Sequence, residues 1–347
     1  MKLYAIYFEP EDWLAFREIR RFGAGSAAKS TFPSPLTFYG AIRTALMKLY
    51  GIQLSYHKKP DLGKYQELLG DDNSPGKIKL FGPFIYSEES GKRKHYFPAP
   101  KNVYVKSKKY KVMKLLEYET RVGEHIFKGL PWIPEVKDVD APDKSFIELN
   151  ELEKLQHNEE FQLENPENYV VETKLGIALD DDKKTKEGML YALSIYRFKN
   201  GGFFMLTDSE ETKNEIEKLD GVFLGAKQRW ARVFVEELET TVFDEPNFEN
   251  IAAMLITPAI YDGGIVPKDL KFGNAEILTV AGGRKMGISG WDYMNGRPKT
   301  LHHAVSPGTV YYLSHKPSLR DSVSNKSKLN LFGFGKCIYI PYETKKI

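Results

Sequence analysis

Several cations accompany a short loop of small residues near the start of the chain, "FGAGSAAKS" at residues 22–30. Guanidinium groups bind phosphate oxygens through paired hydrogen bonds, and glycine lets backbone N–H groups approach a phosphate closely. Only one acid, Glu18, lies between residues 16 and 46. These residue types indicate a phosphate site, and its candidates are Arg17, Arg20, Arg21, Gly23, Gly25, Ser26, Lys29, Ser30 and Arg43.

Three further sets combine cations with aromatic rings next to glycine-rich turns. A planar ring stacks on an unpaired base, while nearby arginines bind phosphates, so the recurrence favours single-stranded RNA. For any single set, the alternative is a core ring with a cation at its rim. The candidates are Gly225, Lys227, Gln228 and Arg229 beside Trp230; Arg284, Lys285 and Arg297 around Trp291; and Gly333, Gly335 and Lys336 beside Phe334.

Catalytic and metal-binding patterns are mostly missing from the sequence. The seven histidines have no His-Glu-x-x-His spacing, and neither a Walker loop nor a cysteine pair is present, so we expect no metal and no cofactor. Adjacent His302 and His303 next to Lys299 are the candidates for acid–base cleavage of RNA, because histidine titrates near neutral pH. The alternative is a strand in which one histidine is buried and the other is exposed.

Composition sets broad limits on location. The single cysteine, Cys337, excludes an intrachain disulfide and fits a reducing cytoplasm. The N-terminus turns acidic after a few apolar residues, and apolar runs are too short to span a membrane, so we expect neither a signal peptide nor a membrane segment.

Charge is unevenly distributed although the net charge is only +3. Residues 91–114 carry nine Lys/Arg and no acid, whereas residues 135–172 carry twelve acids and three lysines. Such separation suits a polyanion on one surface and a basic partner on another, or simply two solvated faces.

The hydrophobic pattern predicts mostly strands with few helices. We expect strands at residues 2–8 and 77–86, a helix from Pro35 with Tyr39, Ile42, Leu46 and Leu49 facing the core, and a basic hairpin at 101–116. Residues 131–166 are acidic and rich in proline, typical of an insertion or mobile segment. Runs at 169–179 and 188–198 predict a projecting hairpin, followed by a short helix at 209–219 and a strand at 230–238.

After residue 244 the pattern restarts, with strands expected at 251–261, 275–283 and 308–315, and residues 329–342 predict a Gly-x-Gly turn that leads into a last strand. Both halves end in a glycine turn that leads into a strand. This repetition predicts an α+β protein of two ferredoxin-like (β-α-β-β-α-β) domains. Residues 1–244 would form the first, with insertions at 91–116, 131–168 and 169–198, and residues 245–347 the second.

Three extended motifs resemble those of a known family, the third Cmr subunit of type III-B CRISPR–Cas effector complexes. They are "FREIRRFGAGSAAKSTFPSPLTFYGAIRTAL" at 16–46, "TKLGIALDDDKKTKEGMLYALSIYRF" at 173–198 and "ISGWDYMNGRPKTLHHAVSPGTVYYL" at 288–313. They occur in the family's order and span both halves of the chain.

This resemblance implies a repeat-associated mysterious protein with two ferredoxin-like domains. It implies an antiviral RNA-binding subunit that cleaves nothing itself and holds the 5′ handle of the CRISPR RNA. The partners implied are the large polymerase-like subunit and the first backbone subunit of a heteromeric complex.

The resemblance also implies roles for individual segments. Residues 17–30 would line the handle-binding cleft, and the helix that carries Arg43 would back it. The turn 225–229 matches the family's first glycine-rich loop, although Ala226 replaces its second glycine and is strained if its backbone is left-handed. The turn 333–336 matches the terminal glycine motif. The hairpin tip at 180–186 would lie near the first guide bases or meet a basic partner.

Two alternatives remain open at this point. The first is a metal-independent endoribonuclease that processes CRISPR repeat RNA, with His302, His303 or His57 as its base. The second is a pure assembly protein whose acidic segment meets a basic subunit.

Overall fold

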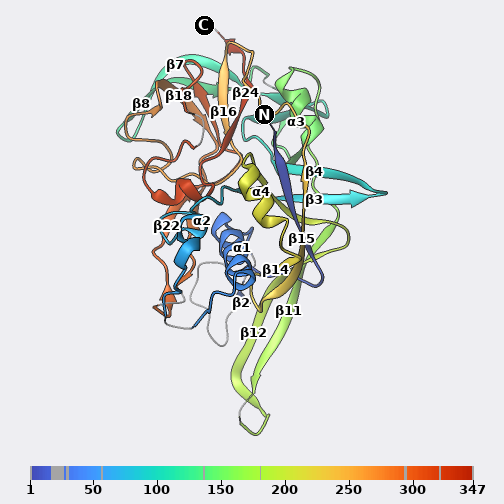
Figure 1. Ribbon diagram of the computed structural model, residues 1–347. Coiled ribbons are helices and arrows are strands. Elements are labelled where there is room, and N and C mark those ends of the chain that lie inside the picture. Colours follow the sequence, from blue (N-terminus) through green and yellow to red (C-terminus); the bar gives the residue numbers. More distant parts are fainter. Residues whose placement is uncertain are drawn as a thin grey trace.

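The computed structural model describes residues 2–16, 27–28, 31–55, 58–135, 137–179, 181–292, 295–319 and 322–345. For residues 27, 28, 178, 179 and 185–191 it describes the backbone only. The chain is an α+β protein dominated by sheets, as the sequence predicts (Figure 1).

The larger sheet has seven strands in the order β10-β4-β3-β13-β1-β15-β14, with all neighbours antiparallel. Its strands are β1 (Tyr4–Pro10), β3 (Phe81–Glu89), β4 (Lys92–Pro98), β10 (Phe146–Glu148), β13 (Gly202–Thr207), β14 (Gly221–Leu224) and β15 (Arg229–Glu237). Helix α1 (Pro35–Leu49) follows β1, and α4 (Glu210–Ile216) follows β13. The succession β1-α1-β3-β13-α4-β15 is therefore β-α-β-β-α-β, with the strands in the spatial order second, third, first, fourth.

The smaller sheet has five strands in the order β17-β18-β23-β16-β24. They are β16 (Ile251–Leu255), β17 (Lys271–Phe272), β18 (Ala275–Ala281), β23 (Val310–Leu313) and β24 (Cys337–Pro341). Strands β16, β18, β23 and β24 repeat the spatial order of the first sheet. Among the described residues, the connection from β23 to β24 contains a 3-10 helix, η2 (Lys328–Phe332), in place of an α-helix.

The two sheets enclose one core between them. Phe84, Phe97 and Phe204 of the larger sheet pack with Met254 and Tyr312 of the smaller one. Helix α3 (Leu149–Gln156) closes this core through Leu149, Leu152 and Leu155.

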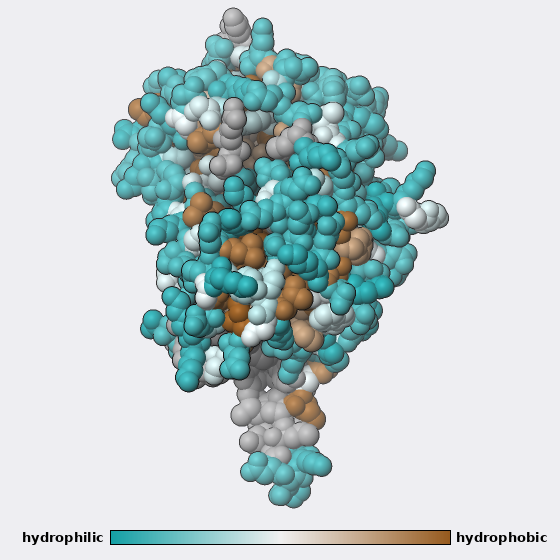
Figure 2. Space-filling model, viewed as in Figure 1, coloured by the Kyte–Doolittle hydropathy of each residue, from teal (hydrophilic) through white to brown (hydrophobic). Residues whose placement is uncertain are grey.

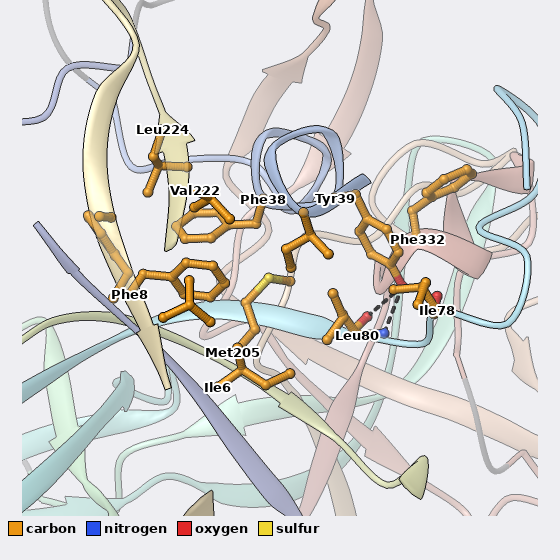
Figure 3. Packing of buried hydrophobic residues seen from close by; sticks show 14 of the residues in the cluster. Ile6, Phe8, Phe38, Tyr39, Ile78, Leu80, Met205, Val222, Leu224 and Phe332 are labelled. Atoms are coloured by element: carbon orange, nitrogen blue, oxygen red, sulfur yellow. Dashed lines mark hydrogen bonds between the residues drawn. The ribbon is translucent and has the colours of Figure 1, made fainter. Parts of the chain in front are cut away.

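A second core lies on the opposite face of the larger sheet, beneath α1 (Figure 3). Phe8 and Met205 of the sheet meet Phe38 of the helix, and Phe332 contributes from the C-terminal half. The buried hydroxyl of Tyr39 accepts a hydrogen bond from the N–H of Leu80 (2.7 Å) and lies 3.2 Å from the carbonyl oxygen of Ile78. This core therefore joins both halves of the chain.

Local sequence explains the helix starts. The Ser34 side chain caps α1 by accepting from the N–H of Leu36, with Pro35 in the first turn, and Ser209 caps α4 through the N–H of Thr212. Tyr39, Ile42 and Leu46 are buried as predicted, whereas Leu49 is wrongly predicted and is 47% exposed. In Figure 2 apolar atoms show over α1 and β14 on an otherwise mainly hydrophilic face.

Smaller ribbons surround the two sheets. The predicted hairpin, β11 (Tyr169–Leu179) and β12 (Thr185–Phe198), projects from the body, and β2 (Ala27–Ala28) pairs parallel with β12 (Figure 1). The other ribbons are β5 (Val103–Lys106), β6 (Lys109–Val112) and β9 (Val139–Asp140); β7 (Lys114–Val122), β8 (His125–Trp132) and β25 (Thr344–Lys345); β19 (Lys285–Ile288) with β22 (His302–Val305); and β20 (Trp291–Asp292) with β21 (Arg297–Pro298). A short 3-10 helix, η1 (Gly63–Tyr65), precedes α2 (Gln66–Leu69).

The acidic segment is more tightly integrated than its composition suggests. Residues 131–166 were expected to form an insertion or a mobile segment. The second half is inserted between β4 and β13 and packs into the fold, so for this half the alternative of a mobile segment is wrong. Strand β10 pairs with β4 at the edge of the larger sheet, and Ile147, Phe161 and Leu163 are buried in the core with α3. Apolar residues at helical spacing outweigh the acids here, because only the outward face of α3 carries charge.

No helix in the described part of the chain is both long and apolar enough to cross a membrane.

Candidate nucleic-acid interface

The predicted phosphate loop lies outside the described residues, but its two ends are placed. Arg17, Arg20, Arg21, Gly23, Gly25, Ser26, Lys29 and Ser30 are not described. The N–H of Thr31 donates to the carbonyl oxygen of Phe16 (2.9 Å), so the two ends of the segment meet. The rings of Phe16 and Phe32 both lie against Phe203 of β13, at centroid distances of 5.6 and 5.8 Å.

The turn 225–229 packs against the start of this cationic segment. The N–H of Ala226 donates to the carbonyl oxygen of Ala15 (2.8 Å), immediately before the cationic segment. Gly225 has a φ of +68°, followed by Lys227 at +64° and Gln228 at +48°. Ala226 is not among the residues with positive φ, so its substitution for glycine causes no strain there. Left-handed backbone at non-glycine residues is costly and concentrates at functional sites.

Two cations lie over one buried indole at the base of the projecting hairpin. The guanidinium of Arg229 lies 4.2 Å from the ring centroid of Trp13 and 3.2 Å from the Asp12 carboxylate. The ammonium of Lys174, on β11, lies 4.8 Å from the same ring. Sequence reasoning missed Lys174, since nothing in the local pattern links it to a tryptophan about 160 positions earlier. The fold thus joins the hairpin, the turn and the base of the cationic segment.

A second cationic surface lies on the ribbon formed by β19–β22 and β20–β21. Ile288 and Ala304 face the core below α1, whereas Arg284, Lys285 and Arg297 are exposed. None of these three cations forms an ion pair within the described residues. The sequence left open whether Trp291 is a core anchor or a stacking ring. Trp291 is 46% exposed and is therefore not a buried core anchor.

The glycine turn at residues 333–336 has a structural role. The N–H of Gly335 donates to the carbonyl oxygen of Pro258 (2.7 Å), and that of Lys336 donates to the Thr257 hydroxyl (2.9 Å). The expectation that this turn offers free N–H groups to a phosphate is therefore wrong. Gly333 has a φ of +81°, and a Cβ atom there would lie 2.3 Å from the carbonyl oxygen of Leu80. Gly333 therefore allows the end of η2 to lie against the backbone at the start of β3.

Arg43 forms a hydrogen bond with the turn that follows α2. Its Nη2 donates to the carbonyl oxygen of Gly70 (2.8 Å). Burial lowers the pKa of this guanidinium, while the nearby carboxylates of Asp72 and Asp71 act in the opposite direction. Arg43 thus supports the turn after α2, which lies beside the second cationic surface.

The two opposite charge blocks of the sequence pair with each other. Lys109 and Glu160 form an ion pair (2.8 Å), as do Lys111 and Glu135 (3.0 Å). The Lys94 ammonium lies 3.6 Å from the carboxylate of Glu164. Much of the charge segregation is therefore complementary within this chain. The interpretation as two separate partner surfaces loses its main support.

The two adjacent histidines cannot serve one phosphate together. His302 and His303 are consecutive residues of β22, so their side chains point to opposite faces of the ribbon. His302 is partly buried and His303 is exposed. Across the described ranges, no group of three or more His, Cys, Asp or Glu side chains is positioned to hold a metal ion.

Comparisons with known proteins agree with this fold. The model of the family described as "CRISPR-associated protein (Cas_Cmr3)" matches residues 6–342. No curated protein matches the sequence. A chain in a cryo-EM structure of the "Type III-B Cmr-beta bound to cognate target RNA and AMPPnP, state 1" shares the fold at 18% identity with a TM-score of 0.52, covering 89% of this chain and 86% of that one.

A second cryo-EM structure, "Type III-B Cmr-beta bound to cognate target RNA", gives a TM-score of 0.51 at the same identity and the same coverage. The fold is therefore shared with those chains, and the family match extends over nearly the whole sequence. The chain belongs to the Cas_Cmr3 family of CRISPR-associated proteins, which is the family that its three motifs predicted.

Proposed function

We propose that this chain is a non-catalytic RNA-binding subunit of a type III-B CRISPR effector complex and holds the 5′ repeat-derived handle of the CRISPR RNA. The observation that carries the proposal is the convergence described above. The turn 225–229, both ends of the cationic segment and the base of the projecting hairpin meet around Trp13 and Phe203. Family membership and the likeness to chains from RNA-bound Cmr-beta structures support an RNA ligand.

The RNA would cross two surfaces on opposite sides of α1. The first is the region around the turn 225–229, where Lys227 and Arg229 would contact phosphates. The second is the ribbon, where Trp291 would stack on an unpaired base between Lys285 and Arg297. Figure 1 shows β14 and β22 on either side of α1.

The proposal includes two ferredoxin-like units and docking on the large polymerase-like subunit and the first backbone subunit. The repeated strand order of the two sheets supports the two units. A non-catalytic role is supported by the opposite orientation of His302 and His303. A cytoplasmic location fits the single cysteine.

A gel experiment tests the proposal. The full chain is incubated with a labelled guide that carries the handle, with and without the large subunit and EDTA, and resolved on native and denaturing gels. We expect a shift that a scrambled handle does not compete, with uncut RNA throughout. A specific cut that survives EDTA would instead identify a processing nuclease. Lack of any shift, in the presence of the large subunit as well, would favour a pure assembly protein.

A further inference from the structure

A basic groove next to α1 contains none of the residues assigned above. We propose that the groove formed by residues 51–55 and 58–65 binds the phosphodiester backbone of single-stranded RNA through Lys58, Lys59 and Lys64. The inference rests on the proposed function and extends the RNA path beyond the ribbon that carries Trp291.

The groove is a cavity of about 610 Å³ that opens to solvent. The side chains of Lys58, Lys59 and Lys64 line it, and all three are exposed. None of them forms an ion pair within the described residues, in contrast to the lysines of the basic hairpin. Unpaired ammonium groups in a hollow raise the local concentration of anions.

Carboxylates in the groove are fewer than the three ammonium groups. Asp61 is the only acid in the lining, and its carboxylate accepts a hydrogen bond from the N–H of Gly63 (3.0 Å). The groove begins at the C-terminal end of α1. The helix dipole gives this end a partial charge of about −0.5, which repels anions. Three of the last carbonyl groups, those of Leu46, Met47 and Lys48, already accept backbone hydrogen bonds. Counting the Asp71 carboxylate as well, whose pKa is lowered by backbone hydrogen bonds and by the charge of Lys59, the three ammonium groups still outnumber the carboxylates.

One wall of the groove is rigid and aromatic. The ring of Tyr65 stacks on that of Tyr50, with the centroids 4.1 Å apart and the planes 12° from parallel. The Tyr50 hydroxyl donates to the Glu215 carboxylate, which ties the pair to α4. The ammonium of Lys64 lies 5.2 Å from the Tyr65 centroid. A fixed wall lowers the entropic cost of holding a ligand.

The groove and the ribbon lie on two sides of the same turn, residues 70–74. On one side, the pKa of the Asp71 carboxyl is lowered by hydrogen bonds from the N–H groups of Asn73 and Ser74 and by the charge of Lys59. On the other side, Asp72 forms an ion pair with Lys299 (3.2 Å), next to the strands of Trp291 and Arg297. In the proposed path, an RNA strand that stacks on Trp291 passes this turn to reach the groove, and the two carboxylates of the turn are engaged by Lys299 and by backbone N–H groups.

This continuity favours RNA over an acidic protein partner. The ribbon offers an exposed ring and arginine forks, which suit unpaired bases and phosphates. Lysines act as point charges that follow a backbone without reading its sequence. The groove would therefore add affinity to the RNA path without adding sequence preference.

The test compares two triple variants of the full chain. In the first, Lys58→Ala, Lys59→Ala and Lys64→Ala remove the groove cations. The control, Lys92→Ala, Lys268→Ala and Lys271→Ala, removes the same charge from exposed lysines that also lack ion pairs among the described residues. Binding of a handle-bearing guide is measured between about 50 and 200 mM salt, the range in which phosphate contacts dominate the salt dependence.

We expect the groove variant to bind about tenfold more weakly at low salt, with a log–log salt slope smaller by about 2, because each single-strand contact contributes about 0.7. The control should stay within about twofold of the wild type, and a Lys→Arg triple at the groove should retain binding. If the groove variant binds like the control, this inference fails while the proposed function stands. If the wild type binds neither alone nor in the presence of the large subunit, both fail. If the groove variant binds RNA normally but no longer assembles with the large subunit, the groove serves an acidic protein and the inference is overturned.

Discussion

Replacing Phe203 by alanine is expected to lower the free energy of unfolding by about 3–5 kcal/mol and to weaken RNA binding as well. Phe203 is fully buried, and its ring contacts five others. Two of these, Phe16 and Phe32, flank the cationic segment, Phe38 lies on α1, and Tyr196 and Phe198 lie at the base of the projecting hairpin. A cavity at this position would loosen the parts of the fold that position the proposed RNA contacts.

A matched variant separates stability from function. Phe272→Ala removes a ring of the same size that is equally buried, but in the core beneath the smaller sheet, where it packs on Tyr261 and Tyr311. Urea denaturation should show similar losses of stability for the two variants. Below the unfolding transition, only Phe203→Ala should bind the handle more weakly. Equal binding by both variants would show that the ring cluster does not hold the binding surface in place.

Gly333→Ala is expected to destabilise the protein by about 3 kcal/mol or more without any RNA present. The substitution combines a left-handed backbone, at a φ of +81°, with a Cβ atom only 2.3 Å from the carbonyl oxygen of Leu80. That oxygen belongs to backbone next to β3 and cannot rotate away. We expect the loss of stability because the added Cβ atom would push η2 away from the larger sheet.

Gly264→Ala is the control for this effect. Gly264 also has a positive φ, +93°, but a Cβ atom there would meet nothing within 4 Å. We expect it to cost only about 1 kcal/mol, the price of the backbone conformation alone. Thermal or urea unfolding of the two variants gives the comparison. If Gly333→Ala is as stable as the control, the glycine turn is not required for packing, and its role would have to be sought in a ligand.

The sequence predicted elements whose signals are local. Ser34 and Pro35 mark the start of α1 through one side-chain hydrogen bond and one fixed dihedral angle, and Ser209 marks the start of α4 through a side-chain hydrogen bond. The projecting hairpin follows from two long strand-forming runs and a polar turn. The repeated pattern of the two halves corresponds to two sheets that share one spatial strand order.

The predictions from sequence were wrong or incomplete for features that depend on contacts between residues far apart in the chain. Strand β10 and helix α3 were not predicted because their segment is acidic. Their buried faces need only a few apolar side chains, such as Ile147 and Leu152. Pairing between Lys109 and Glu160, or between Lys174 and Trp13, depends on tertiary placement that no spacing encodes. The glycine turn at residues 333–336 was a misleading signal. A glycine required by close packing, like Gly333, looks the same in sequence as one that approaches a phosphate.

In the proposed function, the handle lies on the two surfaces beside α1. Ultraviolet crosslinking of a handle-bearing guide to the full chain, with the crosslinked peptides identified by mass spectrometry, tests it most directly. We expect crosslinks at Trp291 on the ribbon and in peptides that contain residues 225–229. Crosslinks confined to the acidic segment 135–172 or to the β7–β8 hairpin, with none beside α1, would contradict it.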